Sequence, residues 1–599
     1  MKILFIHADF VEYEIKEKAI ENAEKVETKN DRMEDTLVAF ISVERDDEDF
    51  EIACNEIKDV AEMVNAKNIL LYPYAHLSSD LAPPDRAIEM IKSIEENLRK
   101  EYNVKRAPFG WYKSFKIGCK GHPLSELSRH INCKKEEKGE EIKSSWYVLT
   151  PDGEMIEAEK FDFSNYEELK KFYEYEAFGS RRAEEQPAHI KLMREHEIVD
   201  YENASDYGNM RWYPKGYLIK KLLEEKVEEM CVQAGAMQVE TPIMYDTSHP
   251  SLEKYIKKFP ARQYIVKGDK NRSFFLRFAA CFGQYLMAHE MQISYKNLPI
   301  RIFEMAKSFR REQHGELAGI KRLRAFTMPD MHTICKDEEQ ALQEFKRQFL
   351  LSIEWSKMLG IEGEIAIRFV KDFFEKNKDF FISLVKIWGK PALVEMWDKK
   401  YFYFVTKFEI NLNDSVGKSF ALSTVQIDVD NPKSFEITYI NENGEKKYPY
   451  LLHASISGGI DRCVCALLEK EAMKIKKGIK PSFPFWLAPT QLRLIPVNDK
   501  FIDDCKKIAK KLRARVDIDD RDESVAKKIR DAEKEWVPII IVYGEKEKEG
   551  RLRPRYRFEC DREEVNIKEL NSLIKEKMKG YPFRKLSLPM MLSERAKFR

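Results

Sequence analysis

The order of strand-like and helix-like segments changes along this chain, and that order limits the folds open to it. Near both ends the two kinds of segment alternate, which favours α/β domains. Between residues 201 and 485 strand-like segments follow one another without intervening helices, which favours an antiparallel sheet. Since 599 residues are too many for one hydrophobic core, we predict a multidomain α/β and α+β protein.

Changes in composition mark four expected parts. Residues 1–146 read as a compact α/β unit, 147–200 as a linker or bridging subdomain, 201–485 as the largest unit and 486–599 as a smaller α/β unit. The run Lys134–Glu141, expected to be solvated, opens the charged connection. The clearest expected strands are Lys2–His7, Leu37–Val43, Asn68–Tyr74, Leu492–Val497 and Pro538–Tyr543, and the clearest expected helices are Glu51–Val64, Arg86–Glu101, Phe501–Val516, Glu523–Trp536 and Ile567–Met578.

The cysteine content indicates the cellular compartment of the protein, whereas its net charge does not indicate its ligand. Lys and Arg number 103 against 102 Asp and Glu, so any phosphate-binding face must come from local clustering. The ten cysteines are scattered singly apart from Cys463 and Cys465, which indicates a reducing cytoplasm and not a disulfide framework. No run of about 18 apolar residues is present, so no membrane span is expected. The start Met1–Ile6 reads as a buried strand and not as a signal peptide.

The segment from Arg301 to Glu312 carries the clearest chemical signal. Together with the residues that follow it up to His332, it reads as strand, loop and strand, with arginines on the first strand and in the loop. Arg310 beside Glu312 suits a nucleotide site, because a guanidinium grips a phosphate in bidentate fashion and a carboxylate accepts from an adenine amino group. The alternative for the triplet Arg310-Arg311-Glu312 alone is a solvated basic hairpin.

Three segments together resemble the motifs of class II aminoacyl-tRNA synthetases. The helix from Pro214 with Val239–Pro242 resembles motif 1, Phe309–Glu312 with Arg324–Phe326 resembles motif 2, and Gly458–Arg462 resembles motif 3. The resemblance implies the class II antiparallel-sheet catalytic core and a homodimer packed through motif 1.

The same resemblance implies the roles of the residues at an ATP site. Arg310 and Arg462 would hold the ATP phosphates, and Glu312 would contact the adenine. Phe326 would stack on the adenine ring, and Arg322 would reach the pyrophosphate end. In-line attack on an α-phosphate needs positioning and charge neutralisation, including that by Mg²⁺, more than covalent help.

Around these motifs the sequence is most similar to the threonyl-tRNA synthetases. Cys281, His332 and His453 match the zinc ligands of that family. Their separations of 51 and 121 residues would not indicate a metal site by themselves, and each residue taken singly is more often part of a core. The resemblance also implies that Asp330 and Gln426 orient L-threonine. Met328 stands where bacterial relatives carry glutamine.

A synthetase that selects threonine through such a zinc site would need a second catalytic centre that removes serine. An open zinc held by three ligands binds the amino and hydroxyl groups of threonine and rejects valine, which has no hydroxyl. Serine keeps the hydroxyl, and the loss of one methyl group is worth only ~1–3 kcal/mol. The H-x-x-x-H motif of the bacterial-type editing domain does not occur in this sequence.

Residues 1–146 resemble instead the archaeal-type editing domain, which is related to D-aminoacyl-tRNA deacylases. The matching segments are Met1–Glu14, Tyr72–Ser79 and Ala107–Arg129. Within them, the residues that correspond to the editing pocket are His76, Tyr112, Lys113 and Glu126. Such a pocket would position water and the terminal 2′-hydroxyl of the tRNA, with the ester carbonyl polarised by Lys113 or by backbone amides. The alternative is that these are surface polar residues of a tRNA-docking module.

The C-terminal part resembles the anticodon-binding domain shared by threonyl, prolyl, histidyl and glycyl synthetases. Trp486–Pro489, Ala526–Arg530 and Gly544–Glu547 carry the resemblance, and Glu547 and Arg555 match the anticodon readers. Splayed bases of a single strand are read by hydrogen bonds and stacking. The alternative for the basic residues at 551, 553, 555 and 557 is a solvated edge strand.

The sequence therefore predicts a cytoplasmic, homodimeric enzyme that uses ATP, Mg²⁺ and one Zn²⁺ per subunit to join L-threonine to tRNA(Thr), and that removes serine attached by mistake. A prolyl-type synthetase is the nearest rival and would not need the zinc residues. A non-catalytic paralogue that binds tRNA is the rival from another class, and the presence of Arg310, Glu312 and Arg462 argues against it.

Overall fold

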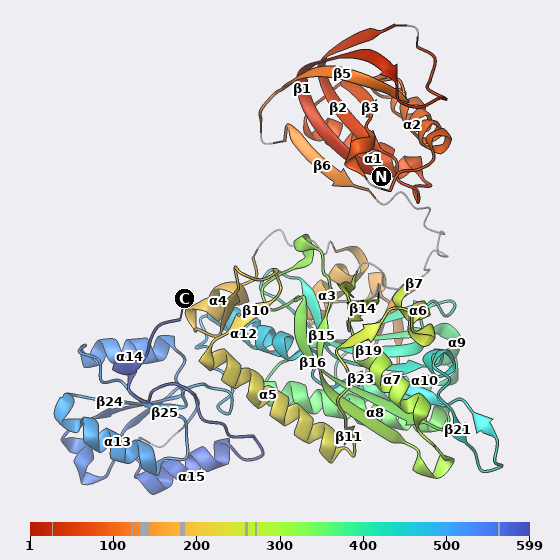
Figure 1. Ribbon diagram of the computed structural model, residues 1–599. Helices are drawn as coiled ribbons and strands as arrows, with labels where there is room; N and C mark the ends of the chain where they lie inside the picture. The colour runs from red at the N-terminus through yellow and green to blue at the C-terminus, as the bar shows by residue number, and fades with distance from the viewer. Residues whose placement is uncertain are drawn as a thin grey trace. The chain divides into compact units, whose positions relative to one another are not determined.

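The computed structural model divides the chain into two compact units, Met1–Ile142 and Lys143–Arg599 (Figure 1). It describes all residues except Glu27, Ser79, Pro123, 132–143, 180–185, 258–261, 270–271, 561–562 and Arg599. The expected charged run Lys134–Glu141 therefore lies outside the described residues. None of the described helices is long and apolar enough to cross a membrane.

The first unit is a six-stranded sheet with two helices. Strands run in the order β4-β3-β2-β1-β5, with β6 also on β1. Their bounds are β1 Lys2–Lys18, β2 Asn30–Ser42, β3 Asn68–Pro73, β4 Asn103–Arg106, β5 Trp111–Cys119 and β6 Glu126–His130, and the helices are α1 Phe50–Met63 and α2 Pro84–Leu98. Ile57 of α1 and Ile91 and Ile94 of α2 pack with sheet residues in one core. The expected α/β architecture is confirmed.

Strand β1 is much longer than the expected Lys2–His7. In its second half the buried Val11, Tyr13 and Ile15 alternate with polar Glu12 and Glu14, which is the pattern of a half-buried strand. The strand extends because β2 and β5 pair with it on both sides over this half.

A ten-stranded sheet forms the centre of the second unit. The order is β11-β15-β16-β23-β20-β19-β17-β18-β7-β8, and only the pairs β11–β15 and β17–β18 are parallel. The bounds are β7 Ser144–Leu149, β8 Met155–Glu157, β11 Met237–Gln238, β15 Ile300–Phe309, β16 Ala325–Cys335, β17 Glu364–Val370, β18 Ala392–Trp397, β19 Phe404–Asn413, β20 Ser419–Asp428 and β23 Tyr450–Ser455. The predicted antiparallel core is thereby confirmed. Strands β7 and β8 lie at its far edge, so part of 147–200 belongs to this sheet.

Three long helices complete this core: α5 (Pro214–Gln233), α8 (Glu338–Leu359) and α12 (Ile460–Lys476). Their apolar faces, for example Leu222, Phe345 and Leu467, are fully buried in one cluster with the sheet. Gly216 in the first turn of α5 lies so close to Ile198 that an added Cβ would stand 2.0 Å from its carbonyl oxygen. The shorter elements used below are η1 Ala75–Leu77, β12 Met244–Asp246, β13 Tyr264–Lys267, β14 Ser273–Leu276, α7 Cys281–Glu290 and β21 Tyr439–Ile440.

The C-terminal part contains a four-stranded sheet of order β25-β24-β26-β27. Its elements are β24 Leu492–Pro496, α13 Ile502–Lys511, β25 Val516–Ile518, α14 Val525–Lys534, β26 Ile539–Tyr543, η8 Lys546–Glu549, β27 Pro554–Tyr556 and α15 Ile567–Lys577. This is the predicted small α/β fold. The first helix ends at Lys511 and not at Val516, because Val516 begins a strand parallel to β24.

Candidate active site

A cavity of about 440 Å³ lies over the central sheet, and nearly all the residues predicted for synthesis line it. They are Cys281, Arg310, Glu312, Arg322, Phe326, Asp330, Gln426, His453 and Arg462. Met328 lines it as well. The segments come from β15 and its following loop, β16, β20, β23 and the start of α12, which are adjacent in the sheet or packed on it. Residues up to 200 positions apart thus share one cavity (262 to 462).

Two arginines in the cavity have no carboxylate partner. Arg310 Nε donates to the Phe278 carbonyl at 3.1 Å, and its guanidinium lies 5.1 Å from the centre of the Phe326 ring. Arg462 donates to the carbonyls of Lys321 and Ala421. Within the described part of the chain neither guanidinium forms an ion pair.

Burial lowers the pKa of both guanidiniums, and the charge of Arg310 adds to this effect on Arg462. Both remain cationic because a guanidinium does not lose its proton in proteins. Two partly buried cations without counter-charges make the cavity a site for an anion.

Glu312 is held between two further arginines. Its carboxylate accepts from Arg262 Nη1 at 2.8 and 2.9 Å and pairs with Arg322 Nη2 at 2.9 Å. Arg322 also pairs with Glu316 at 3.1 Å. These contacts fix the carboxylate in one position at the cavity wall. Arg262 was not predicted from the sequence, since no motif surrounds it.

Cys281, His332 and His453 meet at the wall of this cavity, which Cys281 and His453 line. Cys281 begins α7, while His332 on β16 and His453 on β23 are directly opposite each other in the antiparallel pair. The Cys281 sulfur lies 3.3 Å from His453 Nδ1, which lies 2.8 Å from His332 Nε2. All three donor atoms lie within 4.8 Å of one another, so the cluster could hold a metal ion.

The surroundings of the cluster favour a metal of intermediate softness. Gln284 Oε1 lies 2.8 Å from His332 Nδ1, which leaves the lone pair of Nε2 directed at the other two donors. Burial lowers the pKa of His332 well below its usual range and that of His453 to about 4, so both rings are neutral donors. Burial raises the pKa of the Cys281 thiol, so a thiolate here needs a cation beside it. One sulfur and two imidazole nitrogens form a three-ligand set of the kind that zinc binds with one position open.

Polar groups that could orient a small substrate stand next to the cluster. The buried Asp330 Oδ1 has no hydrogen-bond partner among the described residues, and burial raises the pKa of this carboxyl to about 7. Gln426 lies opposite His453 in the β20–β23 pair, and its Oε1 accepts a hydrogen bond from the Tyr403 hydroxyl at 2.9 Å. Tyr403 was missed at the sequence level, because it is one aromatic among four in succession, Tyr401–Phe404.

A second cavity, of about 350 Å³, lies in the N-terminal unit, and His76, Tyr112 and Lys113 line it. His76 belongs to η1, and the other two belong to β5. The Lys113 ammonium donates to the carbonyls of Pro108 at 2.8 Å and Trp111 at 3.0 Å, and burial lowers its pKa to about 8. Glu126 does not line this cavity. It lies on β6, with Oε1 at 3.6 Å from Cys119 Sγ.

The two predicted anticodon readers lie in different elements of the C-terminal part. Glu547 in η8 accepts from the Gly544 amide at 2.9 Å, just after β26 ends. Arg555 is exposed on β27, opposite Ile540, and lines a small cavity of about 140 Å³ that Glu547 does not line.

Three family descriptions match successive parts of the chain. Residues 1–131 match the "Archaea-specific editing domain of threonyl-tRNA synthetase". Residues 264–471 match the "tRNA synthetase class II core domain (G, H, P, S and T)", and residues 491–577 match the "Anticodon binding domain".

Whole proteins are similar over their full length. The threonine–tRNA ligase of Pyrococcus horikoshii is 54% identical over 626 residues, and that of Methanosarcina mazei is 50% identical over 635, with 100% of both chains covered in each comparison. Among solved structures, the RNA binding domain of threonyl-tRNA synthetase from Cryptosporidium parvum has a TM-score of 0.58 at 20% identity, covering 66% of this chain and 99% of that one. Prolyl-tRNA synthetase of Giardia lamblia has a TM-score of 0.51 at 21% identity, covering 65% and 78%. These two structures share the fold.

The cluster predicts that the protein binds one metal ion through Cys281. Replacement of Cys281 by Ser should remove the bound metal, since a hydroxyl is a far weaker ligand than a thiolate. Metal content measured by mass spectrometry on the purified chain tests this. Cys505→Ser, a buried thiol in the C-terminal part, is the matched control and should retain the metal. An unchanged metal content in the Cys281 variant would refute the site.

Proposed function

The chain belongs to the threonyl-tRNA synthetase (threonine–tRNA ligase) family, and from that premise we propose which of its residues carry each step. It activates L-threonine with ATP, transfers the threonyl group to tRNA(Thr), and carries an N-terminal domain that hydrolyses mischarged Ser-tRNA(Thr). The observation that carries the assignment of the synthetic site is the meeting of two unpaired arginines and the Cys281 cluster around one cavity.

We assign the phosphate contacts of ATP to Arg310 and Arg462. The threonine carboxylate attacks the α-phosphorus, the bond to the bridging oxygen breaks, and pyrophosphate leaves. The two guanidiniums stabilise the charge that develops on the α-phosphate, and Arg322 is assigned to the leaving pyrophosphate, where Mg²⁺ would supply further positive charge. Phe326 stacks on the adenine, and Glu312 contacts its amino group. A ribose hydroxyl at the 3′ end of the tRNA then attacks the acyl carbonyl and releases AMP.

Selection of threonine is assigned to the cluster and the polar groups beside it. We propose that Cys281, His332 and His453 hold one zinc ion, which would supply a coordination site for the amino and hydroxyl groups of threonine. Asp330 Oδ1, which has no hydrogen-bond partner among the described residues, is placed to accept from the amino group, and Gln426, fixed by Tyr403, is placed to orient the substrate. Valine, which has no hydroxyl, would leave these buried groups unsatisfied and be rejected.

We place the editing reaction in the cavity of the N-terminal unit. There the Lys113 ammonium is held by two main-chain carbonyls, and Tyr112 and His76 line the same cavity. A cation at this point would polarise the seryl ester carbonyl while water or the terminal 2′-hydroxyl acts on it. Glu126 lies outside the cavity, so we assign it no contact with the ester.

The assembly is proposed to be a homodimer. Val232 at the end of α5, Met237 on the edge strand β11, and Ile243 and Met244 are 42–50% exposed, although all are apolar. An apolar strand edge left open is a typical protein interface. Every described cysteine is a free thiol, which supports placing the protein in the cytoplasm.

Replacement of Arg310 by Lys should lower kcat/KM for threonine-dependent ATP–pyrophosphate exchange by about 10²–10³-fold, the loss expected for one charge-stabilising donor. A lysine keeps the charge but loses the two-point grip on phosphate. Arg311→Lys, at the exposed neighbouring position, is the control and should retain activity within about twofold. Equal activity of the two variants would count against the assignment.

Editing should depend on the protonated form of Lys113. Because burial lowers the pKa of this lysine to about 8, the cationic form dominates below that pH and is lost as the pH rises through it. Hydrolysis of Ser-tRNA(Thr), corrected for spontaneous hydrolysis, should therefore fall above pH 8. Lys113→Met should be about 10²-fold slower below pH 8, with the difference narrowing above it, while Lys116→Met, at an exposed lysine on the same strand, should match the parent chain. A corrected rate that rises through pH 8 would contradict this role.

Met244→Glu should separate the dimer, because a carboxylate in an apolar interface is desolvated without a partner. Sedimentation should give twice the chain mass of 70.7 kDa for the parent and a single chain for the variant. Ile440→Glu, at an apolar residue with similar exposure on β21, is the control and should stay dimeric. A parent chain that sediments as a monomer would exclude the proposed assembly.

A further inference from the structure

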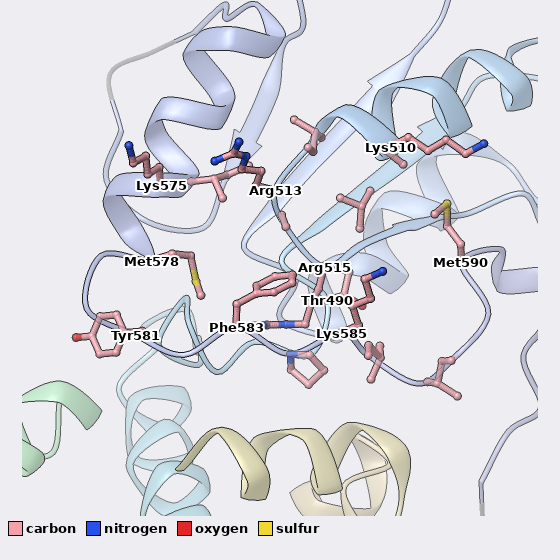
Figure 2. Close-up of a pocket in the computed structure, with 18 of the residues that line it drawn as sticks. Thr490, Lys510, Arg513, Arg515, Lys575, Met578, Tyr581, Phe583, Lys585 and Met590 are labelled. Atoms are coloured by element: carbon pink, nitrogen blue, oxygen red, sulfur yellow. The ribbon is translucent and has the colours of Figure 1, made fainter. Parts of the chain in front are cut away.

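A cavity of about 1320 Å³ lies in the C-terminal part, between the loop from α13 to β25, the end of α15 and the chain after it (Figure 2). Thr490 comes just before β24 and Arg515 just before β25, so the cavity lies at the amino ends of these parallel strands. Glu547 instead follows the carboxyl end of β26, which is parallel to β24. The cavity therefore lies at the amino ends of the parallel strands, whereas this expected anticodon reader lies at their carboxyl ends.

The charges around the cavity are almost all positive. Of the titratable residues that line it and carry charge at neutral pH, seven are basic and one, Glu576, is acidic. The basic residues are Lys510, Arg513, Arg515, Lys575, Lys579, Lys585 and Arg595. Arg595 pairs with Asp517 at 3.0 Å. Within the described residues the other six have no carboxylate within 4.0 Å, in a protein whose charged side chains otherwise pair extensively.

Arg515 is a buried charged residue that the fold holds in a fixed position at the wall of this cavity. It is only 5% exposed, and Nε, Nη1 and Nη2 donate to the carbonyls of Ala488, Arg584 and Trp486 at 3.0, 3.5 and 2.7 Å. Its remaining two N–H groups have no acceptor in the described part of the chain. Burial lowers the pKa of this guanidinium to about 9, and no neighbouring carboxylate offsets the effect.

Arg493, on the adjacent strand, shows the usual arrangement. It is fully buried too, but Asp517 and Glu535 pair with it at 2.8 and 2.9 Å. A buried cation is stable when an anion compensates it. Arg493 has that anion inside the protein, whereas Arg515 faces a cavity with cations around it, so the missing anion is expected from a ligand.

The floor of the cavity is apolar and aromatic. Phe583 is 47% exposed, although its ring centre lies 5.7 Å from the Arg515 guanidinium. Figure 2 shows the Phe583 ring beside Arg515, with Met578 and Tyr581 nearby. Tyr581 is itself fixed by stacking on Trp486, with ring centres 4.8 Å apart. An open aromatic face backed by a guanidinium is a surface on which a nucleobase stacks.

We propose that this cavity binds a nucleotide, with its base on Phe583 and its phosphate among Arg513, Lys575 and Lys585. The volume exceeds the roughly 300–1,000 Å³ of a typical small-molecule site, so a whole nucleotide fits. The same chemistry is present in a free nucleotide and in an unpaired nucleotide of an RNA strand. The site lies apart from the ATP cavity and is independent of the roles assigned there.

Calorimetric titration of the full-length protein tests the proposal with two probes, GTP and the single-stranded RNA pU5. GTP is chosen because the catalytic cavity is assigned to adenine. Lys575→Ala and Phe583→Ala should each weaken binding of the recognised probe at least about tenfold, equivalent to about 1.4 kcal/mol. Lys568→Ala, on the same helix but outside the cavity, should leave the affinity unchanged.

Loss of GTP binding in the two cavity variants supports a free nucleotide as the ligand, and loss of pU5 binding alone supports an RNA strand. Either result supports the site. The proposal fails when neither probe binds the parent chain, or when both cavity variants bind as tightly as Lys568→Ala. It also fails when Arg310→Lys, and not the cavity variants, abolishes GTP binding, because the probe then occupies the catalytic cavity.

Discussion

The register of three antiparallel strands holds the synthetic centre together. In β16, β23 and β20 the residues His332, His453 and Gln426 fall opposite one another, and Cys281 enters from the start of α7. Because side chains alternate between the faces of a sheet, a slip of one residue in any strand would turn its ligand away from the site. The apolar residues on either side, such as Ile334 and Leu452, are fully buried and oppose that slip. The proposed selection of threonine thus depends on the packing of the sheet as much as on the residues of the cluster.

Counter-charge separates buried structural arginines of this protein from Arg310 and Arg462, which we assign to the ATP phosphates. Arg277 is buried with Glu304 at 2.6 Å, and Arg493 is buried between two carboxylates. Such arginines have their counter-charge within the chain and connect segments of the fold. Arg310 and Arg462 have main-chain acceptors but no anion in the described part of the protein. Since an uncompensated buried charge costs stability, its retention is the physical sign of a site that is completed by a ligand.

Much of the architecture could be predicted from the sequence because its elements have clear periodicity. The antiparallel core followed from the order of strands, and its family from three short motifs. The length of β1 and the early end of α13 could not be predicted, since both depend on strands that pair from distant parts of the chain. The same limit applied at the sites. Tyr403 and Arg262 carry no local signal, and the position of Glu126 outside the proposed editing cavity follows from the pairing of β6 with β1.

The division of the chain into two compact units changes how this enzyme fails. Residues of the first unit form their own cores, in which none of the synthetic residues takes part. Damage confined to that unit would leave the residues of the synthetic cavity in place while the editing domain is lost. The cell would then accumulate serine in place of threonine throughout its proteins instead of running short of charged tRNA. Stability of the smaller unit therefore affects the fidelity of translation, and stability of the larger unit affects the supply of charged tRNA.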